Sequence, residues 1–547
     1  MKKYITKIIS EIEDYAPLVK IIELIDKNFL IYDGRSNFIA EINKLDLKKM
    51  HALLSNSEDA IQHNVSIFHA FQKRRVFCGG ILENRMCIDD SKLKKILINW
   101  ANTIYNRKFV LEVTQDCNLR CKYCPYTNET KNRRHQKKSM TLEIAKKAID
   151  NYFSRFTDLV NKTGSVREDI AKEFLSPNLN WYGGEPFLEF KLIEDSLKYF
   201  TSLKWPKLRD DQNYRFSITS NFTICNNKII DFLIKNKVYL FISFDGPKVE
   251  HDRNRVFCNG EGSHEIVFRH ILLLHNADPD YFKKYVTIQA VNSLGTKILN
   301  SEKYLNSLFG KNSPYEAMLV NILDYTSKSE FFPNAISRSL KIQKDWKNKI
   351  SRFIDSIKDV KDLSLSELKT EHIQLYQEIQ DLFSYDKITI DNPYGKDHFD
   401  NIAACPIGFD NLLVDYKGRY HICNKTDGTI SIGDVYDGFN QQKMLDILKN
   451  FSLIFNDERC RKCWNHAFCN ICPAVSLRDG IFHLPTEIEC DYLKTVTESM
   501  IRKFFYLSED VDFYNKIKSE SLKEAFLSSQ LITIFKIQNH EKENFAN

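Results

Sequence analysis

The chain has 547 residues and a formal net charge of +6, and 43% of its residues are hydrophobic. This length suggests roughly three to four domains, and the apolar content excludes a mainly disordered chain. Charges of both signs are interspersed, which argues against a broad nucleic-acid surface. No run approaches the ~18 apolar residues of a membrane span, and the N-terminus lacks the apolar region of a signal peptide. The sequence therefore predicts a cytoplasmic protein that binds neither nucleic acid nor membrane.

Residues 1–105 predict a small α+β accessory domain. A helical opening covers residues 5–25. Two strands around an Asp-Gly turn follow within residues 29–42, and residues 46–54 predict a further helix.

Residues 106–325 predict alternating strands and helices. Strands are expected at 109–113, 179–182, 214–219, 238–243, 285–291 and 317–323, and helices at 141–156, 228–237 and 265–275. Strands separated by helices of this length indicate βα units and a parallel sheet, either open or barrel-like. Residues 326–400 predict a helical connector, with helical periodicity at 342–357 and 365–383, and residues 496–547 predict an amphipathic helical tail.

Ten of the 14 cysteines are gathered in two short regions. In a long chain without an export signal, such clusters indicate metal or redox chemistry rather than disulfides. The first region contains Cys117, Cys121 and Cys124; the second, within residues 401–495, contains Cys405, Cys423, Cys460, Cys463, Cys469, Cys472 and Cys490. The remaining four, Cys78, Cys87, Cys225 and Cys258, are predicted to be core or surface thiols, with a hydrogen-donor role as the alternative.

The first region has the spacing C-x3-C-x2-C on the loop that leaves a predicted strand. Three thiolates on one loop can hold three irons of a [4Fe–4S] cluster, which leaves the fourth iron open to a small ligand. A structural zinc site needs four closed ligands, so zinc with a distant fourth cysteine is the alternative.

This loop, including Tyr123 before its last cysteine, resembles that of the radical SAM superfamily. The resemblance implies that the open iron is chelated by the amino and carboxylate groups of S-adenosylmethionine (SAM). Reduction would then cleave SAM to a 5′-deoxyadenosyl radical that abstracts hydrogen from a substrate. The implied fold is a partial (β/α)6 TIM-like barrel, in which ligands bind at the carboxyl ends of the strands.

Segments at the ends of the next strands resemble the family's SAM-contacting motifs, above all the sequence Gly-Gly-Glu-Pro at 183–186. Glycines let the backbone approach a ligand, Glu185 can accept from the SAM amine, and Arg255 is the predicted partner of the SAM carboxylate. Each segment by itself is also typical of an ordinary turn or solvated loop. The predicted SAM-contacting residues are Tyr123, Gly183, Gly184, Glu185, Pro186, Ser220, Asn221, Ser243, Asp245 and Arg255.

The second cysteine region resembles the SPASM domain, an extension of radical SAM enzymes that modify peptides and proteins. The resemblance implies two auxiliary [4Fe–4S] clusters, and therefore three clusters in the chain. One would be held by Cys460, Cys463, Cys469 and Cys490, and the other by Cys405, Cys423 and Cys472. Because seven thiolates cannot fully ligate two such clusters, the second is predicted to have an open iron or a non-cysteine ligand. A zinc ribbon is the alternative.

The resemblance implies a maturase that forms a thioether or carbon–carbon crosslink in a ribosomally made precursor peptide, with a reductant such as flavodoxin or ferredoxin. The accessory domain would be a winged-helix-like module that captures the leader part of the precursor by β-augmentation, or else a packing cap. The alternatives are a formylglycine-generating anaerobic sulfatase maturase and, from another class, a non-catalytic iron–sulfur electron carrier or metal-stabilised binding protein. Phe187 and Tyr126 are candidates for the substrate side, and the sequence indicates no general base.

Overall fold

A computed structural model describes three parts of the chain: residues 2–54, 90–318 and 407–508. Short gaps within them fall at 16–17, 25–27, 35–37, 104–107, 125, 127–133, 164–175, 208–213, 292–303, 306, 309–314, 410, 427, 467–468 and 470. Several predictions lie outside the described residues: Cys78, Cys87 and Cys405, the helices within 326–400, and the tail beyond residue 508.

The N-terminal module, residues 2–54, has its own small core. Its elements are α1 (Lys2–Tyr15), β1 (Val19–Glu23), β2 (Phe29–Asp33), β3 (Phe38–Ile42) and α2 (Lys44–Leu54). The strands form an antiparallel sheet in the order β1-β2-β3, which confirms the predicted strand pair. The predicted helix over residues 5–25 is wrong at residues 19–23, which form β1 instead. Pro17 in the sequence disfavours a continuing helix, and the β-branched run that follows pairs with β2 and buries Val19 and Ile21.

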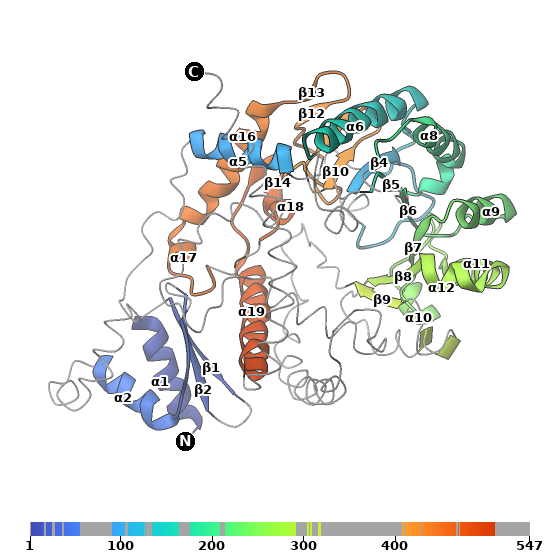
Figure 1. Ribbon diagram of the computed structural model, residues 1–547. Helices are drawn as coiled ribbons and strands as arrows, with labels where there is room; N and C mark the ends of the chain where they lie inside the picture. Colours follow the sequence, from blue (N-terminus) through green and yellow to red (C-terminus); the bar gives the residue numbers. More distant parts are fainter. Residues whose placement is uncertain are drawn as a thin grey trace, which may run out of the picture.

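The central part of the chain confirms the predicted parallel sheet. Six strands pair in parallel in chain order: β4 (Lys108–Thr114), β5 (Asn178–Gly183), β6 (Arg215–Ser220), β7 (Tyr239–Ser243), β8 (Val286–Val291) and β9 (Tyr315–Met318). Between them lie α6 (Leu142–Thr163), η1 (Pro186–Glu189), α8 (Phe190–Ser202), α9 (Asn227–Lys235), α10 (Lys248–His251), α11 (His264–Ala277) and α12 (Pro279–Tyr285). Figure 1 shows α6, α8, α9 and α11 on the outer side of this curved sheet.

Alternating burial along the strands fixes which face meets the helices. Leu179, Trp181, Ile218 and Leu240 are almost fully buried and belong to the main apolar core. The positions between them are polar or aromatic and only half-buried. Because side chains alternate across a strand, these positions form the concave face. Helix starts are specified locally as well, since the Asn226 side chain accepts a hydrogen bond from the Ile229 N–H and caps α9.

The second cysteine region continues the same sheet. Strand β10 (Asn411–Val414) pairs in parallel with β4, and β11 (Arg419–His421), β12 (Gly433–Asp434) and β13 (Gly438–Phe439) extend it antiparallel. The remaining elements are α16 (Gln441–Leu453), η2 (Ile454–Asn456), α17 (Glu458–Arg461), α18 (Pro473–Ser476), β14 (Leu477–Arg478), β15 (Ile481–Phe482) and α19 (Glu487–Ser508). Helix α5 (Asp90–Thr103) lies beside α16 (Figure 1), and its Leu93 and Leu97 belong to the main core. Helix α5 therefore packs against α16 of the second cysteine region, although it falls within the predicted accessory domain.

The N-terminal module contacts the second cysteine region. The Tyr32 ring meets the Trp464 ring edge-on at 6.0 Å between centroids, and Lys20 Nζ lies 3.5 Å from a Glu498 carboxylate oxygen. A Cβ at Gly34 would lie 2.2 Å from the Trp464 carbonyl oxygen, so a larger residue does not fit there. In the described part of the chain no helix is both long and apolar enough to cross a membrane.

Candidate active site

The first cysteine loop, residues 115–124, leaves the carboxyl end of β4 and lies against the segment that follows β7. The Arg120 N–H donates to the Val256 carbonyl at 2.7 Å, and the Lys122 N–H donates to the Asn254 carbonyl at 3.0 Å. Leu119 forms an isolated bridge with Phe257. The loop is therefore held by backbone hydrogen bonds along its length, as the sequence prediction of a strand-end site requires.

Cys117 of this loop is buried, and Cys121 and Cys124 are half-buried. Burial raises the pKa of the Cys117 thiol, and the Glu185 carboxylate and the other two thiols raise it further. Burial also raises the pKa of Cys121 to about 12, although the Arg255 guanidinium opposes this, and Cys124 raises it further. Three mutually repelling thiolates in such a place require positive charge among them, which an iron cluster would supply.

The donor set suits the predicted cluster, with three thiols on one loop and additional polar groups around them. In the described residues no three His, Cys, Asp or Glu side chains converge on the position of a single metal ion. The ligand roles of Cys117, Cys121 and Cys124 thus stay predictions.

Gly183 and Gly184 allow the end of β5 to lie directly on the backbone that leads to Cys117. A Cβ at Gly183, whose φ is 144°, would lie 2.1 Å from the Thr114 carbonyl oxygen, and one at Gly184 would lie 2.1 Å from that of Asp116. The Gly184 and Glu185 N–H groups donate to these two carbonyls at 2.9 and 2.8 Å. The glycines are thus required by the packing of two backbones, whereas the sequence predicted approach to a ligand.

Glu185 is fully buried and joins the ends of β5 and β6. It accepts hydrogen bonds from the Ser220 hydroxyl at 2.8 Å, the Asn221 N–H at 2.7 Å and the Phe187 N–H at 3.0 Å. Burial raises the pKa of Glu185 to about 7, even though these three donors favour the ionised form. Pro186 begins the short helix η1 directly after it. The carboxylate therefore has three donors within the protein, where the sequence predicted the SAM amine as its donor.

Tyr123 of the cysteine loop contacts a buried ion pair formed by Asp245 and Arg255. Arg255 Nε and Nη2 donate to the two Asp245 oxygens at 2.9 and 3.0 Å, and the Tyr123 hydroxyl donates to Asp245 at 2.9 Å. The guanidinium also lies over the Tyr123 ring, 5.3 Å from its centroid. Burial disfavours the charged guanidinium, but Asp245 outweighs it and raises the pKa of Arg255. Asp245 thus orients Arg255, the predicted partner of the SAM carboxylate.

His251, which is not among the predicted SAM-contacting residues, holds the backbone of Asp245 in place. Its Nδ1 accepts the Asp245 N–H at 3.2 Å, so its proton is on Nε2, which lies 2.9 Å from the Ser263 hydroxyl. Burial and the nearby Arg255 charge lower the pKa of His251 well below its usual value. A neutral imidazole therefore fixes the backbone of Asp245.

The concave face of the sheet is polar, a feature that the sequence analysis also missed. Strand pairing places Asn180 beside Ser217, and Ser243 beside Gln289. Buried Glu112 on β4 accepts from the Tyr126 hydroxyl at 2.5 Å and from Gln115 Nε2 at 3.1 Å. The signal was present in the sequence as period-two alternation of polar residues in otherwise apolar strands. Tyr126, a candidate for the substrate side, therefore hydrogen-bonds to a residue of the central sheet. Phe187, the other candidate, is buried in the main core.

Four cysteines of the second region share one cavity of about 460 Å³. They are Cys460, Cys463, Cys469 and Cys490, the set that the sequence assigned to one complete cluster. The cavity is also lined by Glu13 and Lys20 of the N-terminal module and by Lys494 and Glu498 of α19. Burial raises the pKa of Cys490, and the Arg459 charge opposes this shift.

Of the other cysteines assigned to the second region, Cys423 and Cys472 lie within the described residues, and neither lines that cavity. Cys423 follows β11, where its sulfur accepts from the Lys425 N–H at 3.4 Å. Cys472 directly precedes α18. Cys225 is half-buried and Cys258 is exposed.

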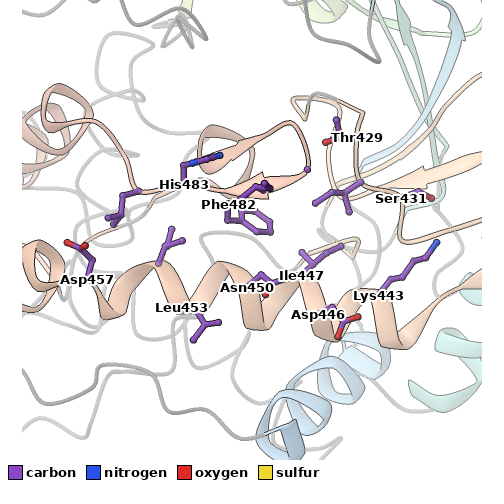
Figure 2. Close-up of a pocket in the computed structure, with 15 residues that line it drawn as sticks. Thr429, Ser431, Lys443, Asp446, Ile447, Asn450, Leu453, Asp457, Phe482 and His483 are labelled. Atoms are coloured by element: carbon purple, nitrogen blue, oxygen red, sulfur yellow. The ribbon is translucent and has the colours of Figure 1, made fainter.

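A larger cavity of about 920 Å³ lies elsewhere, between α16, the β14–β15 hairpin and residues 429–431. Figure 2 shows Phe482 and His483 on one side and Ile447, Asn450 and Leu453 of α16 on the other. Among the described residues, none of the predicted cysteine ligands lines it.

Comparison with known proteins agrees with this geometry. The radical SAM superfamily model matches residues 111–291. An uncharacterized protein of Methanocaldococcus jannaschii is 27% identical over 213 residues, covering 36% of this chain and 64% of that protein. The radical SAM cyclopropyl synthase TigE of Paramaledivibacter caminithermalis is 29% identical over 142 residues, covering 26% and 27%. A cysteine-type anaerobic sulfatase-maturating enzyme of Clostridium perfringens is 25% identical over 234 residues, covering 39% and 52%.

The chain thus spans less than two thirds of the length of these relatives. Among solved structures, native anSMEcpe with bound AdoMet has a TM-score of 0.45 and 18% identity, covering 75% of this chain and 98% of that chain. The family match includes the first cysteine loop, the Gly-Gly-Glu-Pro segment and the Asp245–Arg255 pair. Residues 111–291 thus match the radical SAM superfamily, and this part of the chain is a radical SAM domain.

Proposed function

We propose that the chain is a radical SAM maturase that forms a side-chain crosslink, a thioether or a carbon–carbon bond, in a ribosomally made precursor peptide. The observation that carries the radical part is the C-x3-C-x2-C loop, held on the ends of β4, β5 and β6 inside a matched radical SAM domain. When bound, a [4Fe–4S] cluster and SAM would supply a 5′-deoxyadenosyl radical that abstracts hydrogen from the peptide.

The residues of this chain would hold these groups in distinct ways. Cys117, Cys121 and Cys124 would ligate the first cluster. Arg255, oriented by Asp245, would face the SAM carboxylate, while Ser243 at the end of β7 and the backbone around Gly183–Pro186 would border the rest of the ligand. The half-buried polar positions of the concave face would then meet the peptide.

The remaining regions would bind the peptide and transfer electrons. Residues 401–495 would be a SPASM domain with two auxiliary clusters, joined to the core by a helical connector at 326–400 and followed by a tail at 496–547. Residues 1–105 would be the accessory domain. Its sheet within the described residues has β1 and β3 at its edges, and an edge strand can add an extended leader peptide. Flavodoxin or ferredoxin would be the reductant, in the cytoplasm.

The experiment is anaerobic reconstitution of the full chain, followed by iron, sulfide and zinc analysis and assay with a short peptide encoded beside its gene. We expect about twelve irons per chain, formation of 5′-deoxyadenosine under reduction, and a peptide that has lost two hydrogens. Zinc in place of iron, or iron without SAM cleavage, would favour the electron carrier or binding protein and contradict the proposal.

An anaerobic sulfatase maturase is the second candidate, because one relative bears that name. The same preparation, given a cysteine-type sulfatase peptide, would then produce formylglycine. Modification of the sulfatase peptide, but not of the short peptide encoded beside the gene, would support this alternative.

A further inference from the structure

Asn221 follows β6 directly and lies beside the first cysteine loop rather than facing open space. Its side chain is 8% exposed. Its Nδ2 donates to Cys117 Sγ at 3.6 Å and to the Asn118 side-chain oxygen at 3.0 Å. The sequence predicted Asn221 as a SAM contact, whereas both of these partners belong to the cysteine loop.

The orientation of the Asn221 amide follows from its other contacts. Its Oδ1 accepts from the Thr223 backbone N–H at 2.9 Å, and this N–H can only donate. The Thr223 hydroxyl also donates to Oδ1, at 2.7 Å, and itself accepts from Asn118 Nδ2 at 2.7 Å. A flipped amide would place two donors against each other. The Nδ2 group must therefore face the Cys117 sulfur.

The backbone of Asn221 is fixed as firmly as its side chain. Its N–H donates to the buried Glu185 carboxylate at 2.7 Å. Asn118, Asn221 and Thr223 thus form a closed ring of hydrogen bonds, anchored to β5 through Glu185. Cys117 Sγ also accepts from the Leu119 N–H at 3.4 Å. The Cys117 sulfur therefore has one donor from its own loop and one from the neighbouring strand end.

We propose that Asn221 is a positioning residue that donates a hydrogen bond to the Cys117 thiolate and raises the reduction potential of the first cluster. Hydrogen bonds to the sulfurs are among the features that set the potential of an iron–sulfur cluster. A donor stabilises the more negatively charged reduced form, so its loss makes the potential more negative. This inference rests on the proposed function in one respect, that Cys117 ligates a cluster.

The experiment is a redox titration of the reconstituted full chain, followed by electron paramagnetic resonance of the signal that SAM perturbs. Asn221→Ala removes the donor without adding charge, and we expect a more negative midpoint potential. Asn221→Asp keeps the oxygen for Thr223 but replaces the donor with a negative charge, so we expect a larger shift in the same direction. Asn151→Ala is the matched control, because Asn151 Nδ2 makes two hydrogen bonds at 2.8 Å to Tyr420 and Val435.

The potential distinguishes this role from a purely structural one. The order wild type and Asn151→Ala, then Asn221→Ala, then Asn221→Asp, from least to most negative, supports the proposal. Failure of both Asn221 variants to bind iron at the first loop, while Asn151→Ala binds it normally, supports the positioning part. Wild-type potentials in both Asn221 variants overturn the proposal. Absence of any SAM-perturbed signal in the unmodified chain instead overturns the proposed function.

Discussion

The first cysteine loop lies on the ends of three neighbouring strands, whereas Cys460, Cys463, Cys469 and Cys490 lie on helices and loops that face the N-terminal module. The surroundings of the first loop are parts of a single domain. The residues around the four cysteines of the second region come from segments near both ends of the chain, since Lys20 and Glu498 line the cavity that these cysteines share.

This difference decides how each region is held. The first loop is fixed by backbone hydrogen bonds and by a buried ion pair, and its frame is built from the barrel alone. The second depends on contact between elements that are separate along the sequence, such as Tyr32 and Trp464. We therefore expect changes in the first region to affect SAM chemistry directly. Changes in the second should affect cluster retention and peptide modification.

The largest contrast is expected from removing one thiol in each region. Cys121→Ala should abolish formation of 5′-deoxyadenosine, because the cluster that would bind SAM is lost. Cys463→Ala should remove about four irons as well but leave SAM cleavage without peptide crosslinking. Liquid chromatography of 5′-deoxyadenosine and mass spectrometry of the peptide measure the two effects. Equal loss of SAM cleavage in both variants would contradict the separation of roles.

The next contrast compares an ion pair from each region. Asp245→Asn leaves the buried Arg255 charge uncompensated and should lower the free energy of unfolding by about 3–5 kcal/mol. Glu498→Gln breaks the partly exposed pair with Lys20 and should cost about 0–1 kcal/mol. Urea denaturation followed by circular dichroism measures both. A larger cost for Glu498→Gln would mean that the module interface, rather than the strand ends, dominates stability.

Docking of the N-terminal module can be tested at Gly34. In Gly34→Ala the new Cβ would meet the Trp464 carbonyl at 2.2 Å, so we expect a cost of up to about 3 kcal/mol at this interface. The cavity that holds the four cysteines should open, and a chelator should remove iron from the second region faster. Gly438→Ala is the control, because no atom lies within 4 Å of its Cβ, so the strain of its positive φ of 77° arises without any clash at the module interface. Unchanged iron release in Gly34→Ala would show that the module does not protect the cavity.

Much of the first cysteine region could be predicted, because its strands and motifs are specified by residues close together in the sequence. Strand periodicity located β4 to β8, and the motif residues fall at the strand ends. What escaped prediction depends on partners far away in sequence. Residues 19–23 are a short apolar run that suits helix or strand, and pairing with β2 decides between them. The hydrogen bonds from Ser220 and Asn221 to Glu185 likewise form between segments that are distant in the sequence. The same holds for the pairing of β10 with β4.

A pH-dependent effect smaller than that of Asp245→Asn is expected at the hairpin that joins the two regions. Asp415, between β10 and β11, is buried and accepts hydrogen bonds from His421 Nε2 at 3.1 Å and from the Arg419 and Lys417 N–H groups, each at 2.9 Å. Burial alone would raise the pKa of this carboxyl, but His421 and Arg419 outweigh burial and lower it to about 2.

Because the pKa of Asp415 is lower in the folded chain than in the unfolded chain, the ionised carboxylate stabilises the fold above the unfolded value of about 4. That contribution, about 2 kcal/mol, should be lost as the pH falls from about 5 toward 2. Asp415→Asn should therefore be less stable than wild type at pH 7, and the difference should shrink on acidification. Urea denaturation at a series of pH values measures it. A difference that stays constant with pH would show that Asp415 acts through packing rather than through its charge, and that the link between the two regions is insensitive to acid.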